Sequence, residues 1–373
     1  MKNIFYNFIQ SLSKRQKSGF ITGIICIIAL LILVLYTKFL GDRLYDQQAY
    51  KRWSDDGGVA QISCFYPVTM EDVDDYYFLN LEHNMEQSLK DASIQVSSQN
   101  GKLFTDTLSV TGTIDIKSDY GTSTIKAVGV MNDFFLFHPV ELLDGNYIGG
   151  DMLMQDGIII DEDAAWQLFG SSDIVGMKVM ISGVPHYIAG VAKRAEGHFE
   201  KAAGLSESVC YVSLSTLKQY GIIDAGYTYE IIMPNPVNDF AMKAVNDGLK
   251  DEDKKIDVIE NSKRYQFYPL LIDLRDFGIR SMSRKGIVYP YWENIARGYE
   301  DLFALLLLTK IILALIPSIL LIIYLYGRWK VKTWTWKKIV LYLFEKIKCF
   351  FTYFRNIMKR VLSGKKEKKH DKD

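Results

Sequence analysis

Two stretches of the chain are apolar over a length that suits a lipid bilayer. Residues 20–36 read FITGIICIIALLILVLY, and residues 302–326 read LFALLLLTKIILALIPSILLIIYLY, interrupted only by Lys310 and Pro317. About 20 residues of helix cross a hydrocarbon core of roughly 30 Å. A core helix of a soluble protein is the alternative for a shorter run. The pattern predicts two transmembrane helices, at residues 18–40 and 301–326.

The first apolar stretch also has the basic lead of a secretory signal peptide. It ends in YTKFLGDRL, which has no cleavage site of the small-x-small type, and its apolar part is longer than that of a typical signal peptide. We therefore expect an uncleaved signal anchor.

The residues between the two stretches alternate between strand and helix patterns. Residues 59–67, VAQISCFYP, predict a strand, and residues 92–98, ASIQVSS, predict another. A helix headed by Thr69 is expected between them, because apolar residues recur there at four-residue steps: Val73, Tyr77, Leu81, Met85 and Leu89. This part predicts a strand–helix–strand unit.

Residues 101–200 have a different pattern, in which short β-rich runs such as LSVTGTIDI and STIKAVGVM are separated by Gly, Asp and Asn. The strand and helix rhythm resumes from Ser208, with SVCYVSL, TYEIIMP and a predicted helix at residues 238–249. The predicted fold class is an α+β extracytoplasmic domain at residues 41–300, in which a β-rich subdomain at residues 101–200 is inserted between βαβ halves.

Aromatic residues gather near both ends of the second apolar stretch. Residues 270–300 are interpreted as a stalk that leads into this span after a break at Pro290. Amphipathic rings prefer the headgroup region, so we predict a membrane-interface position for them; packing of the rings before the span within the stalk is the alternative. The residues are Tyr289, Tyr291, Trp292 and Tyr299 before the span, and Trp329, Trp334 and Trp336 after it.

The 44 basic and 44 acidic residues of the 373-residue chain cancel overall, but they are unevenly distributed. Residues 1–17 carry a net charge of +4, residues 41–300 carry −16 and residues 327–373 carry +11. Because basic residues flank both spans on the same side, both termini are predicted to be cytoplasmic in a cell membrane. The overall balance argues against nucleic acid as a partner.

The basic C-terminal segment at residues 327–373 is too interrupted by charge to form a third span. Its polar side chains recur at helical spacing between apolar and aromatic ones, which predicts an amphipathic helix that contacts the lipid bilayer. Docking on the cytoplasmic domain of a partner protein is the alternative. The predicted contact residues are Lys338, Lys348, Arg355 and Lys359.

Residues with recognisable catalytic or metal-binding spacing are scarce. The segment His198-Phe199-Glu200 has an H-x-E spacing, but no nearby Cys pair or second His completes a metal set, and the chain has no P-loop and no G-x-S-x-G. We expect no catalytic residues, no metal site and no cofactor, and therefore not an enzyme. Cys64 and Cys210, in strand-like runs, form either one disulfide or two buried thiols.

Two residues inside the second predicted span are candidates for an intramembrane function. Lys310 is ionisable and lies ten positions into the span, and Pro317 interrupts the helix pattern. The alternative for Lys310 is that it reaches toward the interface or pairs with Glu300 or Asp301.

Residues 141–194 resemble the periplasmic core domain of MacB-type ABC transporter permeases, which include FtsX-like members. The likeness consists of a turn, a hydrophobic strand, a short helix and a final strand, carried by Leu143-Asp144-Gly145, Ile158–Ile160, Ala164, Ala165, Leu168-Phe169-Gly170, Asp173, Ile174, Gly176 and Tyr187-Ile188-Ala189-Gly190-Val191. The order of a span, an outer domain and a second span agrees with that family over residues 18–326.

The resemblance implies a mechanical role, in which motion driven by ATP hydrolysis in a partner is relayed between the membrane and the outer domain. Such permeases usually have four spans, whereas this sequence predicts two. We therefore expect a non-catalytic component of an ABC-type export or envelope-remodelling system, with an ABC ATPase subunit, a four-span permease and a homo- or hetero-dimer as candidate partners. The alternative is a stand-alone envelope scaffold or sensor whose outer domain binds a protein, peptide or cell-wall ligand.

Overall fold

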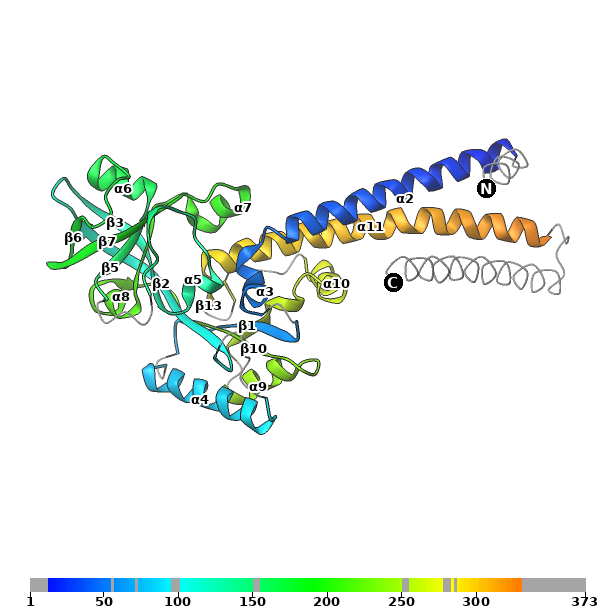
Figure 1. Ribbon diagram of the computed structural model, residues 1–373. Coiled ribbons are helices and arrows are strands. Elements are labelled where there is room, and N and C mark those ends of the chain that lie inside the picture. Colours follow the sequence, from blue (N-terminus) through cyan, green and yellow to red (C-terminus); the bar gives the residue numbers. More distant parts are fainter. Residues whose placement is uncertain are drawn as a thin grey trace, which may run out of the picture. The chain divides into compact units, whose positions relative to one another are not determined.

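The computed structural model describes residues 13–330 apart from 55–56, 71–72, 95–100, 150–154, 250–254, 278–282 and 285–286. The chain divides into two compact units. Leu33–Thr309 forms one unit, which holds the β-sheet (Figure 1), and Met1–Ile32 with Lys310–Asp373 form the other. The predicted tail residues Trp334, Trp336, Lys338, Lys348, Arg355 and Lys359 lie outside the described residues.

The two apolar stretches form long helices, α2 (Lys14–Gly41) and α11 (Tyr291–Lys330). Their most apolar windows are only 11% and 6% buried, whereas a core helix of a soluble protein would be mostly covered. Within the unit that holds residues up to Ile32 and from Lys310, α2 and α11 approach closely at Gly23. A Cβ atom added to Gly23 would lie 3.8 Å from Cβ of Pro317. These two helices are the candidate membrane spans of the described residues.

One half of the other unit is an antiparallel sheet built from two interlocked split βαβ units. Its strand order is β11-β1-β10-β2, so β1 and β2 run parallel on either side of β10, and β10 and β11 run parallel on either side of β1. This is the ferredoxin-like arrangement. Its elements are β1 (Val59–Phe65), α4 (Asp75–Asp91), β2 (Thr105–Lys117), β10 (Thr228–Pro234), α9 (Phe240–Gly248) and β11 (Asp257–Glu260).

The β-rich part is inserted between β2 and β10, and the predicted α+β fold class with such an insert is confirmed. Its strands continue from β2 through β3, β8, β5, β7 and β6 and return to β2, so this part of the sheet closes into a ring. The elements are β3 (Thr122–Asn132), α5 (Phe134–Phe137), β4 (Leu142–Gly145), β5 (Gly157–Asp161), α6 (Glu162–Phe169), β6 (Lys178–Ile181), β7 (Val184–Ala192), α7 (His198–Glu200), η2 (Lys201–Leu205), β8 (Val209–Ser213), α8 (Leu214–Tyr220) and β9 (Ile222–Ile223).

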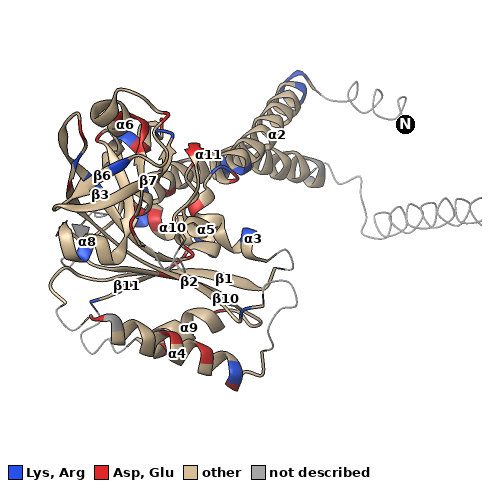
Figure 2. Ribbon diagram, turned by 60° about the vertical axis from the view of Figure 1, so that its left-hand side comes forward, with Lys and Arg blue, Asp and Glu red and all other residues tan. Residues whose placement is uncertain are grey.

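Helices α4 and α9 cover one face of the ferredoxin-like sheet, and α3 (Ala49–Trp53), α5 and α10 (Phe267–Arg275) lie on the other side (Figure 2). The predicted stripe of α4 is confirmed, because Leu81, Met85 and Leu89 are buried in the main core. The helix begins at Asp75 rather than near Thr69, since the Asp74 side chain accepts a hydrogen bond of 2.8 Å from Tyr77 N. Of the strand predicted at residues 92–98, only 92–94 are described, and they lie in the turn after α4.

Short elements connect the sheet to the long helices. They are η1 (Tyr45–Gln48), α3 (Ala49–Trp53), η3 (Asn261–Lys263), α10 (Phe267–Arg275) and the hairpin strands β12 (Ser283–Arg284) and β13 (Ile287–Val288). The residues predicted as a stalk, 270–300, thus contain the end of α10, the hairpin strands and the start of α11. Helix α11 starts immediately after Pro290, where a missing backbone N–H and a restricted preceding residue favour a helix start.

Candidate coupling site at the helix roots

A buried polar network lies on the sheet face opposite α4 and α9. Along β1, Ala60, Ile62 and Cys64 enter the main core, so the alternate residues Gln61 and Ser63 point to the other face. Glu230 of β10 stands directly opposite Ser63 and is 1% exposed. The Ser63 hydroxyl donates a 2.5 Å hydrogen bond to Oε1 of Glu230. A carboxylate is thus placed in the centre of a sheet, where it needs charged partners.

His138 joins Glu230 to the end of the first long helix. Its Nε2 contacts Oε2 of Glu230, and its Nδ1 lies 3.2 Å from Oδ1 of Asp46, in the η1 turn that follows α2. Burial lowers the pKa of His138, but the charges of Glu230 and Asp46 outweigh it and raise the pKa to about 9. The imidazole is therefore protonated at neutral pH and donates to both carboxylates. The Trp292 ring packs on it, with 4.4 Å between centroids.

The same network continues to the start of α11. Asn261 Nδ2 donates a 2.7 Å hydrogen bond to the Ser63 hydroxyl, and its Oδ1 accepts one of 3.1 Å from Arg264. Arg264 then donates two hydrogen bonds, of 2.6 and 2.7 Å, to the carboxylate of Glu293. It also pairs with Glu300, two turns further along α11. Such a bidentate pair fixes both distance and orientation.

Arg297 extends the network back to the sheet edge. Its Nε donates a 2.6 Å hydrogen bond to Glu293, and its Nη2 lies 3.2 Å from Oδ2 of Asp257 in β11. The Tyr289 hydroxyl donates a 2.6 Å bond to the same oxygen, and the guanidinium lies 3.6 Å from the centroid of the Tyr289 ring. Burial raises the pKa of the Glu293 carboxyl, but the guanidiniums of Arg264 and Arg297 lower this pKa by more than burial raises it. The carboxyl therefore stays ionised.

The network can act as a mechanical link. It connects the turn after α2, strands β1, β10 and β11 of the sheet and the first three turns of α11 by mostly charge-assisted bonds that are buried or partly buried. Breaking one such buried pair leaves an uncompensated charge, which lowers the free energy of unfolding by about 3–5 kcal/mol. A shift of either helix root would therefore move the sheet with it rather than slide past it. We define these residues as the coupling network: Asp46, Ser63, His138, Glu230, Asp257, Asn261, Arg264, Tyr289, Glu293, Arg297 and Glu300.

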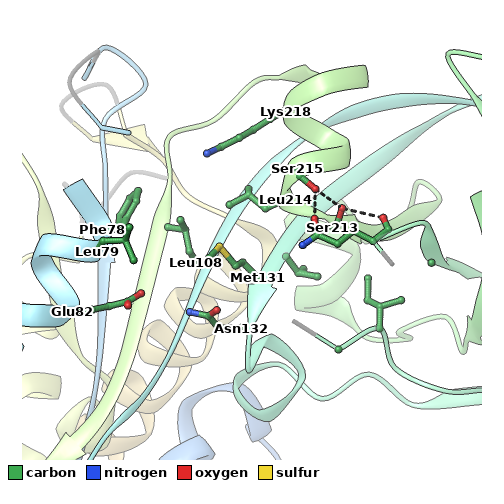
Figure 3. Close-up of a pocket in the computed structure, with 15 residues that line it drawn as sticks. Phe78, Leu79, Glu82, Leu108, Met131, Asn132, Ser213, Leu214, Ser215 and Lys218 are labelled. Carbon is green, nitrogen blue, oxygen red and sulfur yellow. Dashed lines mark hydrogen bonds between the residues drawn. The ribbon is translucent and has the colours of Figure 1, made fainter. Parts of the chain in front are cut away.

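A second candidate site is a cavity of about 280 Å³ between α4, strands β2 and β3, and α8 (Figure 3). Its wall includes the Ser213 and Ser215 hydroxyls, 3.0 Å apart, and the ionisable side chains of Glu82 and Lys218 also line it. Burial, and then nearby Asp106, raise the pKa of Glu82 to about 7. The lining is otherwise mainly apolar and includes Phe78, Leu79, Leu108, Val130, Met131, Ile148 and Leu214. This chemistry suits a small ligand with an apolar body.

The aromatic residues predicted at the membrane interface occupy several environments. Tyr289 and Trp292 are 3% and 2% exposed, which favours the alternative of packing within the protein. The Tyr291 hydroxyl lies 2.8 Å from that of Tyr211, and the half-buried Tyr299 ring packs on Phe199 at 4.7 Å. Trp329 is 76% exposed, near the end of α11.

The other predicted residues are not brought together with this network. Lys310 is half-buried on α11, and Pro317 lies inside the same helix. Cys64 and Cys210 are both buried free thiols, so the disulfide is not formed. Among the described residues, no group of three His, Cys, Asp or Glu side chains could hold a metal ion.

The coupling network is not apparent in the sequence. The outer domain holds four histidines, and no motif marks His138 or Arg264. A signal was present, because Ser63 in VAQISCF and Glu230 in TYEIIMP are polar letters in otherwise apolar strands. The sequence did not reveal that these two strands are neighbours.

The sequence model of the family described as MacB-like periplasmic core domain matches residues 18–250. The curated proteins give no match. One similar solved structure is the periplasmic region of MacB from Actinobacillus actinomycetemcomitans, with 15% sequence identity, coverage of 55% of this chain and 91% of that chain, and a TM-score of 0.37. Another is the extracellular domain of the noncanonic ABC-type transporter YknZ from Gram-positive bacteria, with 16% identity, coverage of 53% of this chain and 99% of that chain, and a TM-score of 0.34.

Proposed function

The chain belongs to the family of proteins with a MacB-like periplasmic core domain, and we propose on this premise that it is a non-catalytic component of an ABC-type export or envelope-remodelling system. Its role is to relay motion between the membrane helices and the outer domain, in the manner of a permease with two spans. The observation that carries this proposal is the coupling network, which joins the roots of α2 and α11 to the sheet.

The proposed topology follows from the charges that flank the spans. Residues 1–17 and 327–373 are cytoplasmic, residues 18–40 and 301–326 cross the membrane, and residues 41–300 form the extracytoplasmic domain. The charges of +4 and +11 on the cytoplasmic segments and −16 on the outer domain support this orientation. The basic tail is then in a position to contact anionic lipid or the cytoplasmic domain of a partner.

The proposed partners are an ABC ATPase subunit and a four-span permease, in a homo- or hetero-dimeric arrangement. The chain has no P-loop sequence of its own, so ATP-driven motion requires a separate subunit. Motion generated there would reach the outer domain through the two long helices.

Purification of the tagged chain from its own membrane tests this function. We expect an ABC ATPase to co-purify, and addition of ATP to change a distance measured between spin labels at Val237 and Tyr120, in the two halves of the outer domain. The Glu293→Gln variant should keep the ATPase but lose most of this change, whereas Glu86→Gln, exposed on α4, should keep both. Absence of an ATPase and a permease from the purified material would contradict the proposal.

The second candidate function is a stand-alone envelope scaffold or sensor, and the cavity of about 280 Å³ favours it. In that case the outer domain binds a small molecule, a peptide or a cell-wall fragment without input from ATP. Two results together would support the scaffold or sensor function over the export function. Function would be retained after deletion of residues 331–373, and ligand binding would be lost in the Leu108→Trp variant, which fills the cavity.

A further inference from the structure

Helix α10 carries its apolar residues on the outside. Its sequence is FYPLLIDLR, and Leu270 is its one buried residue among those described. Phe267 and Tyr268 are 60% and 70% exposed, and Leu271 and Ile272, one turn later, are about 40% exposed. A surface helix of a soluble domain has polar side chains at such positions. The exposed face of α10 is therefore suited to an apolar environment rather than to water.

The start of α10 is fixed against the root of the second span. The Tyr265 ring packs edge-on against Phe303 with 5.0 Å between centroids, and its hydroxyl donates a 3.4 Å hydrogen bond to the carbonyl of Ala296. Arg264 binds Glu293 and Glu300 on the same helix. These contacts hold α10 at the level of residues 296–303 of α11.

That level corresponds to the boundary between the outer domain and the bilayer. Residues 296–303 span about 10 Å of helix, and a headgroup region is about 5–8 Å thick on each side of the hydrocarbon core. Beyond Phe303, α11 exposes Leu305 and Leu308, as expected where a helix meets lipid. Near the end of α2, Phe39 is 51% exposed, and Tyr45 in the following η1 turn is 60% exposed.

We infer that α10 is an interfacial helix that lies in the outer headgroup layer and inserts Phe267, Tyr268, Leu271 and Ile272 toward the acyl chains. Phe and Tyr are residues that this region favours. Phe267 and Tyr268 of α10 are thus among the exposed aromatic residues of this boundary, whereas Tyr289 and Trp292 are buried in protein. The inference requires that α11 crosses a membrane, but it does not depend on an ABC partner.

Spin labels on the full chain test the inference. The background carries Cys26→Ala and Cys349→Ala and keeps the fully buried Cys64 and Cys210. Labels are placed at Leu271→Cys, at Tyr268→Cys, and at the control Val237→Cys, which is exposed before α9. The chain is reconstituted into vesicles of phosphatidylethanolamine and phosphatidylglycerol. The accessibility of each label to oxygen and to a water-soluble nickel chelate is then measured.

We expect the chelate to reach the labels at positions 268 and 271 several-fold less than the label at 237, while oxygen reaches them equally or more. Equal access of the chelate at all three positions would place α10 in water and overturn the inference. Exclusion of both reagents would indicate a covering protein, and dipolar broadening between labels would indicate a second copy. Either result would also overturn it.

Discussion

Glu230 and its partners illustrate how a single charged residue can be held in the centre of a sheet. Its side chain is 1% exposed and lies between Tyr229 and Ile231, which face the main core on the opposite side. Both of its carboxylate oxygens are occupied, one by the Ser63 hydroxyl and one by His138. The charge is tolerated because the protein supplies a proton donor at each oxygen.

Replacement of His138 by Gln should remove a pH-dependent contribution to stability. The histidine pKa is raised from 6.5 to about 9 by its carboxylate partners. Its contribution is therefore complete below pH 6.5 and is lost as the pH rises through 9. Denaturation of the full chain in detergent should show about 3 kcal/mol less unfolding free energy for the variant at pH 6 and a smaller difference at pH 9.5.

The matched control for this experiment is His83→Gln, on the exposed side of α4. It removes a histidine outside the coupling network and should keep the pH profile of the native chain. A His138→Gln variant whose stability follows pH as in the native chain would contradict the assigned role of His138.

Replacement of Glu82 by Gln should stabilise the outer domain at alkaline pH. Burial and Asp106 raise the pKa of Glu82 from 4.5 to about 7, so its presence favours the folded state less as the pH rises from 4.5 through 7. Because the side chain is only partly buried, we expect a gain of about 1 kcal/mol at pH 8 and little change at pH 4. Thermal unfolding at the two pH values measures it.

Glu86, one turn further along α4, provides the comparison for Glu82. It is exposed and pairs with Lys90 at 2.7 Å. The Glu86→Gln variant should therefore show no gain at pH 8. Equal stabilisation by both substitutions would point to a general charge effect of the acidic domain and not to the cavity.

At the scale of elements, the junction between η3, α10 and α11 depends on one guanidinium. Arg264 is 4% exposed and contacts Glu293 and Glu300, which are themselves buried. In the part of the chain that the structure describes, no backbone hydrogen bond joins η3 or α10 to α11, so side-chain contacts set their relative positions. The stability of this junction is thus concentrated in a few charged groups.

The Arg264→Gln substitution should loosen that junction. Two buried carboxylates lose their main partner, and the expected loss in unfolding free energy is about 3–5 kcal/mol. Hydrogen exchange should increase most in β11 and at the start of α11. Exposed Arg275 of α10 is the control, and Arg275→Gln should leave the unfolding free energy nearly unchanged. Equal effects of the two substitutions would rule out the proposed junction.

The ferredoxin-like sheet and the inserted ring of strands are joined through strand β2, which belongs to both. The long strand β2 pairs with β10 of the ferredoxin-like sheet near its start and with β6 of the inserted ring near its end. Its pairing with β3 runs from Thr107 to Lys117, over nearly all of the strand. The two halves of the outer domain are therefore joined through the backbone hydrogen bonds of β2.

The proposed orientation predicts which cysteines are accessible from outside the cell. A membrane-impermeant maleimide should label a Val237→Cys variant in intact cells, because residues 41–300 are proposed to be extracytoplasmic. Native Cys349 should react only after the membrane is permeabilised. Labelling of Cys349 in intact cells would contradict a cytoplasmic tail.

Local periodicity predicted many of the elements but not how distant elements meet. The stripe of Leu81, Met85 and Leu89 indicated helix α4 because burial of a helix repeats over four residues. By contrast, the pairing of Ser63 with Glu230 depends on the order of strands, which a single strand does not encode. For a similar reason the sequence left two predictions open for Trp292, because a position next to a span does not reveal that α5 and His138 cover the ring.

The position of β1 sets an order of events during synthesis. Ser63 in β1 pairs with Glu230, 167 residues later, and accepts a hydrogen bond from Asn261, 198 residues later. The first strand thus leaves the membrane with both edges unpaired, while the strands of the inserted ring can already meet each other. Long-range pairing of this kind is slow, and open strand edges promote aggregation. Export of the chain to residue 260 therefore limits how early the outer domain can complete its folding.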